Sequence, residues 1–312
     1  MTRPQPPGSA SSSSSSASTP REATADTPVP SSAAGPHVSL RAAFVGGGNM
    51  ATALIGGLVD AGVAASQVHV IEPIAAQRDR LLARFPGLRV HERAEPAALT
   101  DANIVVLAVK PQHLRDAARE LASLVQAVPV VLSIAAGIRI ADLSRWLGGY
   151  TRIVRAMPNT PALVGKGITG AHAGPAVGRA ARDTAALVLE AGGAVQWFDA
   201  EADLDTVTGL SSSGVAYVFY VLEALEEAGV AQGLPRATAR ELAYATLEGS
   251  VALARASGDE PAQLRANVTS KGGTTERGLA ALRERGVDEA LRAAVAAATA
   301  RAREMGDELG AA

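Results

Sequence analysis

The sequence predicts an α/β protein in which a doubly wound sheet is followed by an all-α domain. Continuously apolar runs such as 104–109 and 128–133 are typical of parallel strands that are covered on both faces. These runs alternate with helical patterns, as in doubly wound sheets. Strands are expected at 42–45, 68–71, 88–90, 104–109, 128–133 and 152–155, and added strands at 167–171 and 194–198. Beyond about residue 200 only helices are expected, at 212–231, 235–257, 260–268, 275–285 and 287–309.

The composition bounds the class of protein. The 312 residues are enough for about two domains, and the formal net charge of −2 predicts neither nucleic acid nor a membrane surface as a partner. Because there is no cysteine, disulfides and thiolate metal ligands are excluded, and we expect a cytoplasmic protein. The 5 histidines lack metal-ligand spacing, so no metal site is expected. No apolar run reaches the ~20 residues that cross a bilayer.

The chain is expected to have three regions. Residues 1–37 are rich in Ser, Pro, Ala and Thr and predict a disordered, low-complexity tail. A start of translation near Val38 is a further hypothesis for this tail. Residues 38–200 would form the sheet domain and residues 201–312 the helical domain. The helix at 212–231 is apolar on nearly all sides in its first half, which predicts burial against a second subunit.

The first strand leads into three glycines and then into a helix. This order is typical of the corner of a Rossmann-type sheet that binds a dinucleotide. The glycines let the pyrophosphate approach the backbone, and the helix N-terminus attracts its negative charge. The residues expected at this corner are Gly46, Gly47, Gly48, Asn49, Met50 and Ala51.

Later strands also end in unusual residues. Lys110 follows the strand at 104–109, and ligands of such sheets lie beyond the carboxyl ends of the strands. We therefore expect Lys110 over the cofactor cleft, with a solvated loop lysine as the alternative. The small residues at 133–137 would let a flat ring approach the backbone, and the prolines of 155–161 would stiffen a third strand end.

The helical region contains the segment NVTSKGGTTE at 267–276. Gly272 and Gly273 lie between hydroxyl residues just before a helix, which predicts a concavity of backbone N–H donors suited to a carboxylate. Ser270 or Thr275 would add a hydroxyl donor. The alternative is a helix N-cap with a capping box.

Taken together, these segments resemble the pyrroline-5-carboxylate reductase family. The matching segments are VGGGNMA, LAVKPQ, SIAAG, MPNTP, GLSSSGVAYVF and VTSKGGTTERGL, from Arg41 to about Ala302. The resemblance implies the last enzyme of proline biosynthesis, which transfers hydride from NADPH or NADH to 1-pyrroline-5-carboxylate and gives L-proline. It also implies a Rossmann domain, a helical domain that forms a homodimer, further assembly of dimers, and an active site between the two domains.

The resemblance also assigns roles to residues. Besides the glycine turn, the cofactor would contact Ala108, Val109, Lys110, Pro111, Ala135, Ala136 and Gly137, with Asn267 nearby. The substrate would be held by Ser270, Gly272, Gly273, Thr274 and Thr275. Thr275 would be the catalytic hydrogen-bond donor to the ring nitrogen, and catalysis would depend mainly on positioning and on exclusion of water.

Two departures from the family pattern stand out. The usual SGSGPAY reads SSSGVAY at 211–217, which puts the backbone geometry at the start of the long helix in doubt. Lys271 replaces a common proline, a change that the loop is expected to tolerate.

Glu72 directly follows the second strand. An acidic residue there hydrogen-bonds the ribose hydroxyls of the cofactor and repels a 2′-phosphate. We therefore expect NADH to be used at least as well as NADPH. An ordinary strand-end carboxylate is the alternative, and Arg78 and Arg80 lie near enough in sequence to serve NADPH.

Two other classes of function are alternatives to a pyrroline-5-carboxylate reductase. A β-hydroxyacid dehydrogenase-like reductase also joins a Rossmann domain to helices, but such enzymes place a catalytic lysine on an interdomain helix. No lysine lies within 210–232, which disfavours that class. A non-catalytic NAD(P)-sensing regulator would leave the loop at 270–275 unexplained.

Overall fold

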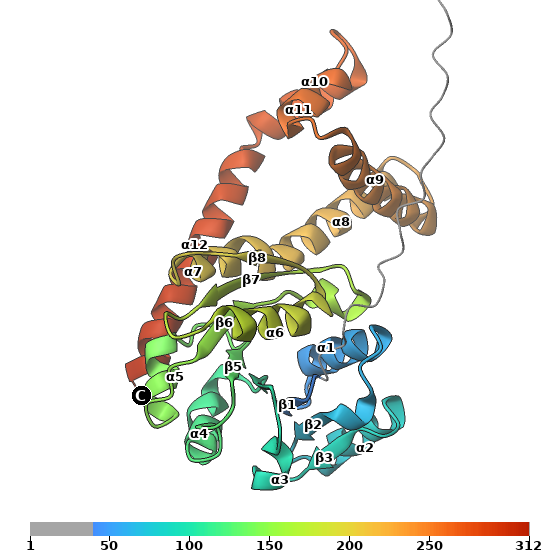
Figure 1. Ribbon diagram of the computed structural model, residues 1–312. Coiled ribbons are helices and arrows are strands. Elements are labelled where there is room, and N and C mark those ends of the chain that lie inside the picture. Colours follow the sequence, from blue (N-terminus) through green and yellow to red (C-terminus); the bar gives the residue numbers. More distant parts are fainter. Residues whose placement is uncertain (1–39, 312) are drawn as a thin grey trace, which may run out of the picture. The chain divides into compact units, whose positions relative to one another are not determined.

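The computed structural model describes residues 40–311, so the predicted tail at 1–37 lies outside the described residues. Figure 1 shows a sheet flanked by helices, followed by a series of helices alone. The predicted fold class is therefore confirmed. Residues 40–311 belong to one compact unit, and the expected domain boundary at residue 200 lies inside this unit and stays a prediction.

Within residues 40–311, one sheet of eight strands has the order β3-β2-β1-β4-β5-β6-β7-β8. Strands β1 to β6 are parallel, β7 is antiparallel to β6, and β8 is parallel to β7. The first six strands have the order of a dinucleotide-binding doubly wound sheet. The strands are β1 (Ala42–Val45), β2 (Val68–Ile71), β3 (Arg89–His91), β4 (Ile104–Leu107), β5 (Val130–Ser133), β6 (Ile153–Met157), β7 (Gly167–Ala173) and β8 (Gly193–Trp197).

Helices cover both faces of this sheet. Along β1, Phe44 belongs to one core, which also includes residues of α1, α2 and α6, and Val45 belongs to the other, which includes residues of α4 and α5. Successive residues of a strand face opposite sides, so a strand buried on both faces must be apolar throughout. The helices are α1 (Asn49–Asp60), α2 (Ala75–Arg84), α3 (Pro96–Leu99), α4 (Pro111–Leu121), α5 (Ile140–Trp146) and α6 (Arg179–Glu190), with 3₁₀ turns η1 (Ala65–Gln67) and η2 (Thr160–Val164).

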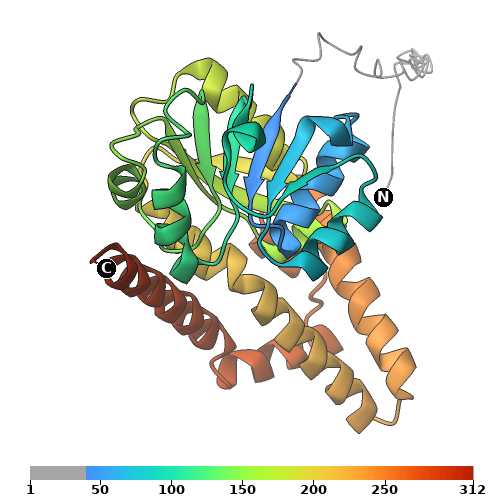
Figure 2. The ribbon, with the colours of Figure 1, turned by 90° about the horizontal axis from the view of Figure 1, so that it is seen from below.

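The remainder of the described chain is helical. It consists of α7 (Asp203–Val207), the π-helical turn η3 (Thr208–Ser212), α8 (Gly214–Ala231), α9 (Arg236–Ser257), α10 (Pro261–Asn267), α11 (Thr274–Glu284) and α12 (Val287–Ala311). Helices α8 and α9 pack against each other, and α12 packs on α7 and η3. The long α12 returns toward α5 and the sheet (Figure 1, Figure 2). None of these helices, nor any other in residues 40–311, has the length and hydropathy needed to cross a membrane.

Helix α8 is strongly apolar, yet none of its residues is buried in the single chain. Val218, Phe219 and Tyr220 are 51%, 63% and 73% exposed. Contiguous exposure of large apolar side chains marks an interaction surface. The structure therefore leaves bare the helix face that the sequence predicted to be covered by a second subunit.

Some element ends differ from the sequence-based expectation. The strand expected from residue 128 begins at Val130, because Pro129 has no N–H to donate to a neighbouring strand. The strand expected to run to 109 ends at Leu107, where the chain turns toward Pro111. Short helices such as α3 and α5 were not expected.

Candidate active site

The glycine turn at the end of β1 is held in a conformation that requires glycine. Gly46 has a φ of +95°, and a Cβ at this position would lie 3.0 Å from the carbonyl oxygen of Ala108. Gly48 is the N-cap of α1, and no atom lies within 4 Å of the position that its Cβ would occupy. Ala51 is completely buried, which lets α1 pack closely on the sheet. A pyrophosphate fits this cradle, because it is open above Gly48 and faces a helix N-terminus.

The carboxyl ends of the central strands meet at this turn. The Gly46 N–H donates to the Ile71 oxygen at 2.8 Å, and the Ala108 N–H donates to the Val45 oxygen at 2.8 Å. The Ile134 N–H donates to the Leu107 oxygen at 3.1 Å. The structure thus brings three predicted cofactor segments to one edge of the sheet: 46–51, 108–111 and 135–137.

Lys110 and Pro111 begin the helix that follows β4. Lys110 is the N-cap of α4 and is exposed, and Pro111 occupies the first turn of that helix. Proline suits the first helical position, because the N–H that it lacks would have no intrahelical acceptor there. The exposed Lys110 is thereby held at the edge where the other cofactor segments lie.

Glu72 lies under the glycine turn and is 7% exposed. Its Oε2 accepts the Gly47 N–H at 2.9 Å, and its Oε1 accepts the Ile74 N–H at 2.9 Å. The side-chain amide of Gln77 donates to the carbonyl oxygen of the same residue, Gly47. The two peptide groups that flank the Gly47 Cα are therefore each held by a side chain, and Glu72 has a positioning role that the sequence did not indicate. Its role toward the ribose stays a prediction.

Gln77 is a site residue that sequence reasoning missed. Its contact with Gly47 spans 30 residues and carries no local pattern. Arg78, considered above as a group for NADPH, donates instead to the carbonyl oxygens of Glu72 at 2.9 Å and Pro73 at 2.8 Å.

Residues that follow β6 form hydrogen bonds with the first residues of the helical part. Asn159 is 8% exposed, and its Oδ1 accepts the Ile168 N–H at 3.0 Å. Its Nδ2 donates to Ser211 Oγ at 3.2 Å, and Ser212 Oγ donates to the Pro158 oxygen at 3.1 Å. Ser212 replaces the usual glycine of the family pattern, so this departure adds a hydrogen bond to the segment 155–161. Although this chain lacks the glycine and the proline of the family pattern, the segment before α8 forms a π-helical turn, η3.

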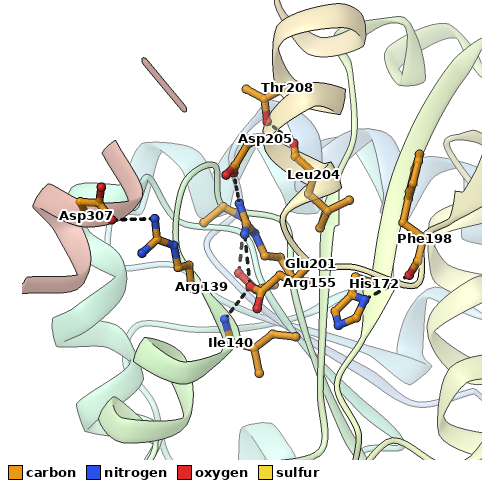
Figure 3. Close-up of polar contacts among 12 residues, drawn as sticks. Arg139, Ile140, Arg155, His172, Phe198, Glu201, Leu204, Asp205, Thr208 and Asp307 are labelled. Atoms are coloured by element: carbon orange, nitrogen blue, oxygen red, sulfur yellow. Dashed lines mark hydrogen bonds and ion pairs between the residues drawn. The ribbon is translucent and has the colours of Figure 1, made fainter. Parts of the chain in front are cut away.

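A buried ion-pair cluster lies beside this connection (Figure 3). Arg155 of β6 is 4% exposed, and its Nη1 and Nη2 atoms lie 3.1 Å from Glu201 Oε1 and 3.1 Å from Asp205 Oδ1. The same Glu201 oxygen accepts the Ile140 N–H at 2.8 Å. The cluster therefore ties β6 to α7 and to the start of α5.

The predicted substrate loop lies between α10 and α11. Gly272 has a φ of +74°, and its N–H donates to Glu276 Oε2 at 2.7 Å. Gly273 is the N-cap of α11, so Thr274 and Thr275 occupy its first two positions. The first N–H groups of a helix have no intrahelical acceptor. The hydrogen bond that Glu276 accepts is similar to that of a capping box, which was the alternative interpretation of this segment. The N–H groups at the start of α11 still have the geometry of an anion-binding site.

Within one chain, this loop is not brought to the cofactor edge. Its residues form hydrogen bonds within the segment 263–277, including the one that Asn267 Oδ1 accepts from Gln263 at 2.7 Å. In Figure 1, α10 and α11 lie far from the strands β1, β2 and β4. The predicted roles of Asn267 and of the residues at 270–275 stay predictions.

In the part of the chain from 40 to 311, no three His, Asp or Glu side chains are placed to hold a metal ion. The doubly wound sheet with a glycine cradle and a helical second part defines a class, the dinucleotide-dependent oxidoreductases with two domains.

Comparison with known proteins narrows this class. A family model described as NADP oxidoreductase, coenzyme F420-dependent, matches residues 41–137, and one described as pyrroline-5-carboxylate reductase dimerisation matches residues 201–305. The pyrroline-5-carboxylate reductase of Pseudomonas aeruginosa is 42% identical over 86% of this chain and 98% of its own length. That of Pisum sativum is 36% identical over 84% of this chain and 94% of its own.

Solved structures agree with this assignment. A pyrroline-5-carboxylate reductase from Coxiella burnetii has a TM-score of 0.80 and 34% identity, covering 86% of this chain and 98% of that one. The Plasmodium falciparum pyrroline carboxylate reductase with NADP bound has a TM-score of 0.76 and 28% identity, with coverage of 86% and 98%. The chain belongs to the pyrroline-5-carboxylate reductase family and is an NAD(P)H-dependent oxidoreductase.

Proposed function

We propose that this protein reduces 1-pyrroline-5-carboxylate to L-proline, the last step of proline biosynthesis, with NADPH or NADH as the reductant. The observation that carries the proposal is the pairing, in one chain, of the glycine cradle at 46–51 with the loop at 270–275. The cradle suits a dinucleotide, and the loop suits a small carboxylate. The similarity to named reductases over more than four fifths of the chain supports it.

The chain's own residues bind and orient the reactants. The cradle at 46–51 and the start of α1 would hold the pyrophosphate, while segments 108–111 and 135–137 would contact the rest of the cofactor. When bound, the cofactor supplies the hydride for the C=N carbon. The N–H groups and hydroxyls of Ser270, Gly272, Gly273 and Thr274 would hold the substrate carboxylate. Thr275 would donate a hydrogen bond to the ring nitrogen, and the proton would come ultimately from solvent.

The functional unit would be a homodimer in which each site uses two chains. The bare apolar face of α8 supports this, and so does the match of residues 201–305 to a dimerisation family model. Because the loop at 270–275 and the cofactor edge are separate in one chain, a second copy would supply the loop. Dimers would assemble further, and the enzyme would act in the cytoplasm.

The cofactor would be NADH at least as readily as NADPH. The position of Glu72 directly after β2 supports this, because a carboxylate there disfavours a 2′-phosphate.

The test is an assay of the purified full chain with 1-pyrroline-5-carboxylate and either NADH or NADPH, followed by loss of absorbance of the reduced cofactor. 3-Hydroxy acids with the oxidised cofactors are assayed in parallel. Turnover of pyrroline-5-carboxylate alone is expected. Turnover of a 3-hydroxy acid instead would indicate a β-hydroxyacid dehydrogenase, and cofactor binding without turnover of either substrate would indicate a sensor.

A further inference from the structure

The last turns of α12 meet the loop that follows β5 backbone to backbone. Gly137 of this loop has a φ of +78°, and a Cβ on it would lie 3.3 Å from Met305 Cβ. Gly306 is buried, and a Cβ on it would lie 2.9 Å from the Gly137 carbonyl oxygen. Real Cβ atoms do not approach a carbonyl so closely, so an added methyl group would force the helix or the loop to shift.

Polar contacts hold the residues that directly follow this meeting point, at the end of the loop. Arg139 Nη2 lies 2.7 Å from Asp307 Oδ1 of α12 (Figure 3). The next residue, Ile140, donates its N–H to Glu201 Oε1 at 2.8 Å. That carboxylate is itself fixed by the buried Arg155 at 3.1 Å. The loop is therefore held between α12 and the ion-pair cluster.

We propose that residues 305–307 of α12 position the loop Ala135–Gly137 for the dinucleotide, so that cofactor affinity depends on the C-terminal helix. Gly306 and Asp307 are then positioning residues, since they act through the loop. The dimerisation family model ends at residue 305, so these turns lie at and beyond its end. The inference rests on the proposed function, because the loop's role as a cofactor contact does.

Gly310 of the same helix provides a matched control. It is buried like Gly306, but a Cβ on it would meet the carboxylate of Asp142 on α5, with Asp142 Cγ at 2.9 Å, and not the loop. Because the end of a side chain can turn away more easily than a backbone carbonyl, Gly310→Ala should disturb the packing of α12 without moving Gly137.

The experiment measures NADH and NADPH dissociation constants of the full chain by fluorescence titration, together with KM for each reactant. Gly306→Ala is expected to weaken cofactor binding by about fivefold or more while KM for pyrroline-5-carboxylate changes by less than about twofold. Gly310→Ala should leave cofactor binding within about twofold of the wild type. Hydrogen exchange of the amides at 135–140 should accelerate in Gly306→Ala alone.

A second pair of variants keeps the proposal testable if Gly306→Ala does not fold. Asp307 is 70% exposed by side chain, so Asp307→Ala removes the contact with Arg139 and little else. Asp307→Ala is expected to weaken cofactor binding by about threefold. The control is Asp288→Ala, which removes an exposed ion pair with Arg292 on the same helix and should leave cofactor binding unchanged.

Two results would overturn the proposal. Cofactor binding within about twofold of the wild type in both Gly306→Ala and Asp307→Ala would show that α12 does not position the loop. Equal weakening in Gly306→Ala and Gly310→Ala would show a general effect of helix docking. A wild-type chain that binds neither cofactor would overturn the proposed function itself, which is distinguishable because the wild type is titrated first.

Discussion

At the scale of single residues, Glu72 orders the glycine turn and is proposed to influence the choice of cofactor. Its oxygens accept the N–H groups of Gly47 and Ile74. Because it directly follows β2, its charge would repel a 2′-phosphate. Removal of the charge should therefore favour NADPH. We expect Glu72→Gln to raise the NADPH/NADH ratio of kcat/KM by about tenfold, since close charge repulsion at such a site is worth about 1–2 kcal/mol.

The measurement is steady-state kinetics with both cofactors at saturating pyrroline-5-carboxylate. Glu120→Gln, which removes an exposed carboxylate of α4, is the matched control and should leave the ratio unchanged. An unchanged ratio in Glu72→Gln would mean that this carboxylate only orders the turn.

Thr275 is the residue on which the proposed chemistry most depends. It is an exposed residue at the second position of α11, where its N–H has no intrahelical acceptor. Loss of one hydrogen bond that strengthens in the transition state typically costs about 10²-fold in kcat. Thr275→Ala should show this loss, measured by initial rates, with cofactor affinity unchanged by fluorescence titration. Thr184→Ala, whose hydroxyl donates to the Ala180 oxygen on the exposed α6, is the control, and near-normal turnover in Thr275→Ala would refute the assignment.

The residues of the cofactor cradle were predictable because their reason is local. Gly46 has positive φ at the end of an apolar strand, and a run of glycines at such a place is visible in the sequence. Gln77 and Gly306 could not be found in this way. Each lies against a backbone carbonyl of a residue that is distant in the sequence, and neither is part of a recognisable local sequence pattern.

At the scale of elements, the ion-pair cluster of Arg155 fixes the junction between β6 and α7. Removal of Arg155 would leave Asp205, which is 7% exposed, as a buried charge without its partner. Arg155→Leu is therefore expected to lower the free energy of unfolding by about 3–5 kcal/mol in urea denaturation. Arg155→Leu combined with Asp205→Leu should recover part of this loss, because the uncompensated charge is gone.

The control for this prediction is Arg179→Leu on the surface of α6. Arg179 is 95% exposed by side chain and lies 3.8 Å from Asp183, so its removal should change stability by less than about 0.5 kcal/mol. A loss of similar size in both single variants would show that the cluster contributes no more than a surface pair.

The strands and long helices were predictable from periodicity, since apolar runs and helical stripes are properties of short segments. The expected ranges 68–71 and 287–309 differ little from β2 and α12. The turn η3 was not predictable, because its π-helical geometry depends on contacts between Ser211, Ser212 and the segment 158–159, some fifty residues earlier. Short α3 and α5 carry too few residues for a periodic pattern.

At the scale of the whole molecule, the open question is how the loop at 270–275 reaches the cofactor edge. The loop's own bonds are local, and α8 exposes Phe219 and Tyr220, which a second subunit would cover. If each active site takes its cradle from one chain and its loop from the other, two different defects can complement each other. Gly48→Asp is suited to the first defect, because a Cβ at this position would meet no atom within 4 Å and the added charge would repel the pyrophosphate.

Thr275→Ala provides the second defect. In a dimer of one Gly48→Asp chain and one Thr275→Ala chain, one site would receive both defects and the other site neither. Random pairing of co-expressed chains makes about half of the dimers mixed, so about a quarter of wild-type activity should return. The measurement compares co-expressed chains with each variant expressed alone. Activity no higher than the average of the two single variants would place the whole site within one chain, and the loop would then have to move to the cofactor edge of its own subunit.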